Sequence, residues 1–175
     1  PALQKPQLLH LTRKYSYIGP AWYSREIQIP AEWKGKDCIL HLERVLWDTQ
    51  VWVDGKKVEG HEESLTTPHK YDLTSYLHPG KTQILTIRVD NRKRYDISTG
   101  NLAHAYTNDT QVMWNGILGD MYIVAEDKAR IENLQLYPDA ASRTVKAIIT
   151  LQNSSEETKQ INLNLQIKGK DDGKH

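Results

Sequence analysis

Short runs of alternating apolar and polar residues constrain the fold of this chain more than any other feature of its sequence. Residues 85–89 read Leu-Thr-Ile-Arg-Val, which places the apolar side chains on one face of a β-strand. Comparable runs, bounded by residues that favour turns, occur at 23–29, 38–45 and 116–125. Helical periodicity is almost absent, and its best candidate is a single turn at 74–77 that Asp72 could cap. This pattern predicts an all-β protein built as an antiparallel sandwich or barrel.

Two octads of nearly the same sequence, DTQVWVDG at 48–55 and DTQVMWNG at 109–116, raise the question of an internal repeat. Their flanking residues differ, so we interpret them as two separate strands that each lead into an Asx-Gly turn. The first octad continues into Lys-Lys-Val and predicts a β-hairpin, because Asp54-Gly55 suits the type I′ turn. We expect Trp52 to cover one face of the sheet that contains this hairpin.

The composition is that of a soluble globular protein, with 38% hydrophobic and 26% charged residues. No apolar run approaches the roughly 20 residues that span a bilayer, so no membrane partner is expected. Lysine and arginine total 23 against 22 for aspartate and glutamate, and the basic residues are scattered, which argues against nucleic-acid binding. The single cysteine, Cys38, excludes an intrachain disulfide. We expect a periplasmic or extracellular location, and a cytoplasmic one also fits the sequence.

The sequence changes character near residue 127, and we therefore predict two domains, 1–127 and 128–175. The first holds the strands described above. Three further alternating runs lie in the second, at 131–137, 144–151 and 161–167. A polar hairpin loop is expected at 153–159. Three strands cannot close a sandwich, which needs roughly seven, so we interpret the second domain as the opening of a β-sandwich that this chain cuts short.

The segment 92–109 shows little alternation and is rich in glycine, asparagine, histidine and tyrosine. Long irregular loops in compact domains are often functional. Together with the second octad, this segment supplies planar hydrogen-bonding groups beside an aromatic ring, which is the composition of a sugar-contacting surface. The residues concerned are His104, Tyr106, Asn108, Asp109, Gln111, Trp114 and Asn115. Each of them alone could instead be a turn residue whose hydrogen bonds are satisfied.

Ionisable residues elsewhere give weaker signals. His-Glu-Glu at 61–63 is compatible with a metal site or an acid/base pair, but as a loop after a hairpin we expect it to be solvated surface. We expect His69 to have a structural role, and we expect Arg25 to point inward with Ile27 and to pair with a carboxylate. The sequence has no His/Cys cluster with zinc spacing, no glycine-rich phosphate loop that opens a helix, and no supported Ser-His-Asp set. No metal or cofactor is therefore predicted.

Four longer motifs occur in a fixed order. They are GPAWYSREIQIPAEWKGKDCILHLERV at 19–45, VWVDGKKV at 51–58, PHKYDLTSYLHPGKTQILTIRVDN at 68–91 and WNGILGDMYIVA at 114–125. In this order they resemble the sugar-binding domain of glycoside hydrolase family 2, which includes β-galactosidases, β-glucuronidases and β-mannosidases. The resemblance covers about residues 15–125. Two positions depart from the family pattern: Gly119 stands in place of arginine, and the loop YSYIGP lacks an asparagine that some β-galactosidases place there.

The resemblance implies a jelly-roll (galactose-binding-like) β-sandwich followed by a partial immunoglobulin-like β-sandwich, and beyond them a (β/α)₈ barrel. Two catalytic carboxylates, about 5 Å apart in a retaining mechanism, belong to that barrel, so no catalytic residue is expected in these 175 residues.

On this basis we expect the chain to be the non-catalytic N-terminal part of an enzyme that acts on β-galactosides. Its jelly roll would lend loop residues to sugar binding, namely Asp109, Gln111, Trp114 and Asn115. Its partners would be carbohydrate and the remaining domains of the same chain. Unpaired strand edges in 131–167 could also make it a homo-oligomer. A free-standing carbohydrate-binding module and a purely structural interaction domain remain alternatives.

Overall fold

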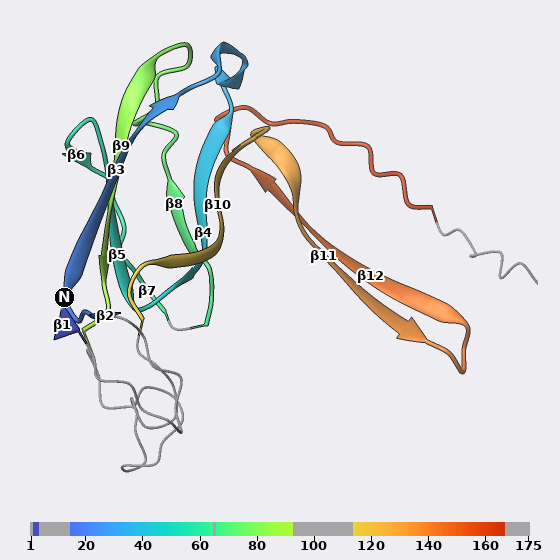
Figure 1. Cartoon of the computed structure of the whole chain (residues 1–175). Helices are drawn as coiled ribbons and strands as arrows, with labels where there is room; N and C mark the ends of the chain where they lie inside the picture. The colour runs from blue at the N-terminus through green and yellow to red at the C-terminus, as the bar shows by residue number, and fades with distance from the viewer. Residues whose placement is uncertain (1, 4–14, 65, 93–113, 167–175) are drawn as a thin grey trace, which may run out of the picture. The chain divides into compact units, whose positions relative to one another are not determined.

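The computed structural model describes residues 2–3, 15–64, 66–92 and 114–166 (Figure 1). Within these residues the chain is all-β, because every regular element is a strand except one 3₁₀ turn, η1 (Ala31–Trp33). The described part contains no helix long and apolar enough to cross a membrane. The chain divides into two compact units, Pro1–Asp127 and Lys128–His175. The predicted all-β class is confirmed.

The larger sheet of the first unit contains five antiparallel strands. Their order is β3 (Pro20–Gln28), β9 (Thr82–Asp90), β5 (Asp48–Val53) and β6 (Lys56–Lys57), and β7 (Glu62–Glu63) also pairs with β5. Asp54 and Gly55 connect β5 to β6 with φ angles of 48° and 78°, the left-handed values that a type I′ turn requires. The rings of Trp22 and Trp52 lie 5.0 Å apart on this sheet. The predicted hairpin and the covering role of Trp52 are confirmed.

The second sheet of this unit contains three antiparallel strands. Their order is β10 (Ile117–Glu126), β4 (Asp37–Val45) and β8 (His69–Asp72). Alternate residues of both sheets, together with Leu73 directly after β8, form one apolar core, whose buried members include Leu40, Leu42, Val51 and Val89. Two short strands, β1 (Ala2–Leu3) and β2 (Tyr15–Ser16), pair with each other. The first unit is therefore a two-layer antiparallel sandwich.

A single turn follows β8, as predicted for residues 74–77. The backbone N–H of Leu77 donates to the Leu73 carbonyl at 3.0 Å. Asp72 caps the turn, because its Oδ1 accepts a hydrogen bond from the Thr74 N–H at 2.8 Å.

Strand β10 carries a β-bulge at Gly119, where its register against β4 shifts between Leu118 and Met121. Gly119 has a φ of 74°, and the carboxylate of Glu43 on β4 occupies the space that a side chain at 119 would need. Glu43 Oε2 accepts a hydrogen bond from the Asp120 N–H at 2.6 Å. The glycine that departs from the family pattern therefore has a local structural reason in this chain.

A cleft of about 880 Å³ lies between β3 and β10, which are the edge strands of the two sheets. Tyr23, Arg25 and Ile27 line it from β3. Arg25 has the inward phase that we expected, but it is exposed and forms no ion pair with the described carboxylates. The expectation of a buried, paired Arg25 was wrong because the sandwich is open along this edge and solvent reaches the side chain.

The second unit contains a long hairpin formed by β11 (Ala129–Asp139) and β12 (Thr144–Asn153). The predicted strands at 131–137 and 144–151 lie within it. Residues 161–166 are not a strand, so the third predicted strand is wrong over that range, and no hairpin closes across 153–159. An alternating sequence forms a strand only when a neighbour completes its hydrogen bonds, and neither edge of the β11–β12 pair bonds to this segment. The immunoglobulin-like identity of the unit stays a prediction.

Candidate functional site

The ends of several strands meet at one end of the first unit, and we call this end the rim. It consists of residues 17–20, 46–48, 61–63, 90–92 and 114–116. Strand register places Pro20 of β3 and Asp48 of β5 on either side of Asp90, the last residue of β9. Glu63 of β7 pairs with Asp48 from the other side. Figure 1 shows β2 and β7 at this lower end of the unit.

Asn91, the first residue after β9, joins three segments of the rim. It is fully buried. Its Oδ1 accepts a hydrogen bond from the Gly19 N–H at 2.9 Å, and its Nδ2 donates to the carbonyls of Tyr17 at 3.0 Å and Trp114 at 2.8 Å. Buried backbone groups need such partners. This one side chain therefore fixes the start of β3 and the residues before β10 in a single arrangement, which the sequence alone did not indicate.

The structure brings together two of the four predicted sugar-binding residues. Trp114 and Asn115 both lie in the rim, directly before β10. The other two, Asp109 and Gln111, lie outside the described residues. Contact of any of the four with sugar stays a prediction.

Trp114 and Asn115 differ in their surroundings. The half-buried indole of Trp114 packs against the buried side chains of Leu46 and Trp47. Asn115 Nδ2 donates to the Gly19 carbonyl at 2.8 Å, whereas its Oδ1 is buried without a hydrogen-bond partner in the described structure. A buried acceptor left unpaired is costly.

Two arginines and two aspartates form a charged network at the ends of β5 and β9. Arg88 donates to Asp48 Oδ1 at 3.1 Å and to Asp90 Oδ2 at 2.5 Å. Arg92 donates to the same Asp90 oxygen at 2.5 Å. Hydrogen bonds from Arg92 hold the pKa of Asp90 below its ordinary value. Both aspartates are fully buried, and a buried carboxylate is stable only when it is paired.

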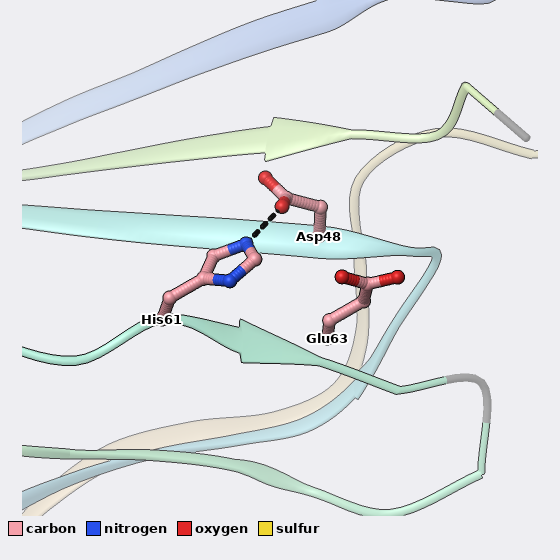
Figure 2. Close-up of side chains that lie close together, drawn as sticks. All are labelled: Asp48, His61 and Glu63. Atoms are coloured by element: carbon pink, nitrogen blue, oxygen red, sulfur yellow. Dashed lines mark hydrogen bonds and ion pairs between the residues drawn. The ribbon is translucent and has the colours of Figure 1, made fainter. Parts of the chain in front are cut away.

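His61 and Glu63 point toward Asp48, and the three side chains form a compact cluster (Figure 2). His61 Nε2 is hydrogen-bonded to Asp48 Oδ2, and Glu63 Oε1 accepts a hydrogen bond from the Trp47 indole at 3.0 Å. The expectation of solvated surface holds for His61 but was wrong for Glu63, because β7 pairs with β5 and brings Glu63 beside Trp47. The available sequence signal was the alternate spacing of 61 and 63, which places both side chains on one face of a strand.

His69, at the start of β8, is fully buried. Its Nδ1 lies 2.6 Å from Thr49 Oγ1, and its Nε2 lies 3.3 Å from the Ser64 carbonyl. Because a carbonyl can only accept, Nε2 carries the proton and Nδ1 accepts from the threonine hydroxyl. Burial lowers the pKa of His69 below its ordinary value. The neutral imidazole links the two sheets, which agrees with the structural role that we expected.

The family model described as "Glycosyl hydrolases family 2, sugar binding domain" matches residues 3–125 of this chain. The chain is 28% identical over 118 residues to a β-galactosidase of Thermoanaerobacter pseudethanolicus. It is 23% identical over 158 residues to a β-glucuronidase of Formosa agariphila. These alignments cover 65% and 85% of this chain but only 16% and 15% of the relatives. The chain therefore spans a small part of the length of the curated relatives that it matches.

Solved structures of two enzymes share the fold. A β-glucuronidase of Ruminococcus gnavus aligns with a TM-score of 0.65 at 17% identity, covering 81% of this chain and 25% of that one. A β-D-glucuronidase of Dictyoglomus thermophilum aligns with a TM-score of 0.62 at 18% identity, covering 77% and 26%. At these identities the likeness shows a common fold alone.

Proposed function

This chain belongs to the sugar-binding domain family of family 2 glycosyl hydrolases, and we propose that it is the non-catalytic N-terminal part of a β-galactosidase-like enzyme. In this proposal the catalytic carboxylates lie in another part of the parent enzyme. The first unit supports that part and lends its rim to the sugar site. The small share of the enzymatic relatives that this chain covers supports such a division.

The observation that carries the proposal is the fixed position of Trp114 at the rim. Its carbonyl is bonded to Asn91, and its half-buried ring rests on Leu46 and Trp47. An aromatic ring held in this way can stack on a sugar ring at little cost in side-chain entropy. Asn115, whose Nδ2 is held by a hydrogen bond to the Gly19 carbonyl at 2.8 Å, follows Trp114 directly in the rim. Asp109 and Gln111 complete the proposed set from the sequence.

A neutral galactoside suits the described rim better than a uronate does. Proteins often recognise a sugar carboxylate through a guanidinium group. The two described arginines of the charged network beside the rim, Arg88 and Arg92, already donate to Asp90. Hydroxyl groups, in contrast, can be bound by amide and carboxylate side chains of the kind proposed here. The proposed substrate is therefore a β-galactoside.

Two measurements test the division of function. Purified alone, the 175-residue chain should not hydrolyse a nitrophenyl β-galactoside, and turnover by it would reject the proposal. In the parent enzyme, Trp114→Leu keeps an apolar contact with Leu46 but loses the stacking surface, so KM for the galactoside should rise with little change in Tm. Trp22→Ala is the control, because Trp22 is a 58% exposed tryptophan that is not one of the rim residues.

The same experiments separate the alternatives. An unchanged KM in Trp114→Leu would favour a purely structural domain. Clear saturable binding of galactosides by the 175-residue chain alone would favour a free-standing carbohydrate-binding module.

A further inference from the structure

We propose that Asp48, His61 and Glu63 bind a divalent transition-metal cation of the zinc class. One donor atom from each residue lies within 4.8 Å of the other two, and Figure 2 shows the three side chains converging on one space. Zinc binds nitrogen and oxygen ligands at about 2.0–2.2 Å, which requires ligand atoms roughly 3–4 Å apart. Small side-chain adjustments therefore convert this cluster into a coordination site.

Strand pairing holds the three residues in place. Asp48 and Glu63 are direct partners in the β5–β7 pair, and such partners have Cβ atoms about 4.5–5.5 Å apart. His61 occupies the alternate position before Glu63, so an extended chain presents both side chains on the same face. All three ligands therefore come from two adjacent segments whose relative position is set by backbone hydrogen bonds.

The local charge favours a cation at this position. Three described carboxylates, Asp48, Glu63 and Asp90, lie near two guanidinium groups, Arg88 and Arg92. Both arginines donate hydrogen bonds to Asp90, and Arg88 also donates one to Asp48. On the side of Asp48 and Glu63, two carboxylate groups lie together, and a cation placed there would contact oxygens of both. Asp48 is fully buried, and buried carboxylates in proteins are paired or coordinate a metal.

Groups outside the ligand set orient both carboxylates. Arg88 donates a hydrogen bond to Oδ1 of Asp48 at 3.1 Å, while Oδ2 is hydrogen-bonded to His61. The Trp47 indole donates a hydrogen bond to Oε1 of Glu63 at 3.0 Å, and the second oxygen of Glu63 accepts no hydrogen bond from the described residues. Hydrogen bonds of this kind fix ligand orientation in metal sites, and their loss weakens metal binding.

The donor set selects the class of cation. One imidazole nitrogen and two carboxylate oxygens suit Zn²⁺, Mn²⁺ or Ni²⁺, whereas Ca²⁺ and Mg²⁺ prefer all-oxygen sites and Cu⁺ prefers sulfur. The His61 side chain is 44% exposed, so water can complete the coordination. The metal would take the position of the proton between His61 and Asp48. The site needs no sugar, and it stands independently of the proposed function.

Isothermal titration of the 175-residue chain with Zn²⁺ tests the site. His61→Ala and Glu63→Gln should each weaken binding at least about tenfold relative to the wild type. Glu63→Gln keeps an acceptor for the Trp47 indole, so it should fold normally. His78→Ala removes an exposed histidine outside the cluster and is the matched control, which should bind Zn²⁺ as the wild type does.

A crystallographic measurement locates the ion directly. Crystals soaked in Zn²⁺ should show an anomalous peak bounded by Asp48, His61 and Glu63. In solution, Zn²⁺ should raise the Tm of the wild type and should not raise the Tm of Glu63→Gln. Equal Zn²⁺ affinity in the wild type and His61→Ala would overturn the proposal. The absence of an anomalous peak at this position would overturn it as well.

Discussion

Replacement of Asn91 by alanine should destabilise the first unit by about 3 kcal/mol, because its side chain forms three hydrogen bonds with described residues and each contributes about 1 kcal/mol net. The bonds join Asn91 to Gly19, Tyr17 and Trp114. Alanine would leave one N–H and two carbonyls without these partners. Since Asn91 is fully buried, water replaces the lost bonds poorly. We therefore expect the loss in free energy of unfolding to be larger than the loss caused by replacing an exposed asparagine.

Urea denaturation followed by tryptophan fluorescence measures the effect. With an m value of about 1.5 kcal/mol/M, the midpoint should fall by about 2 M while m stays constant. Asn115→Ala is the internal comparison, because it removes one described hydrogen bond, to Gly19, and should cost about 1 kcal/mol. If Asn91→Ala costs no more than Asn115→Ala, the reasoning that Asn91 joins the three rim segments is refuted.

Three other changes report on the rest of the first unit. Gly119→Ala should cost about 1–2 kcal/mol in the same denaturation assay, because it forces alanine to a φ of 74° and displaces the carboxylate of Glu43; an unchanged midpoint would contradict this. Leu42→Ala should lower the free energy of unfolding by about 2–5 kcal/mol, because Leu42 is fully buried in the core. A loss well below this range would contradict the prediction. Burial lowers the pKa of His69, so the unfolded chain binds a proton more readily than the folded chain does. The contribution of His69 to the free energy of unfolding should therefore be constant above about pH 7 and fall as pH decreases below about 6.5. His69→Gln should show a weaker fall over that range, and parallel curves would refute the assignment.

The strands of the first unit could be predicted because their signals are local. Each run holds its apolar phase and its turn residues within one short stretch of sequence, as in Asp54-Gly55 between β5 and β6. The Asp72 cap of the turn at 74–77 is similarly local, because donor and acceptor lie two residues apart. Such features need no knowledge of the remaining chain.

The rim could not be predicted in the same way, because its contacts join distant segments. Asn91 and Gly19 are 72 positions apart in sequence, and no pattern around either residue indicates the other. His61 lies 13 positions from Asp48, and it meets that residue only because β7 pairs with β5. The exposure of Arg25 depends on β3 being an edge strand, which the residues of β3 do not reveal.

The Asx-Gly pairs that end the two octads show how similar residues can have different surroundings. Asp54-Gly55 forms a hairpin because the lysines that follow pair back onto β5. In Asn115-Gly116 the next residue, Ile117, pairs instead with β4 of the other sheet, and Gly116 adopts a φ of 119° with no space for a side chain beside the Tyr23 hydroxyl. An Asx-Gly pair permits positive φ in both places, but the strand that receives the following residues decides whether the chain turns back. For this reason the second octad ends at the rim, where its tryptophan and asparagine can be tested as sugar contacts.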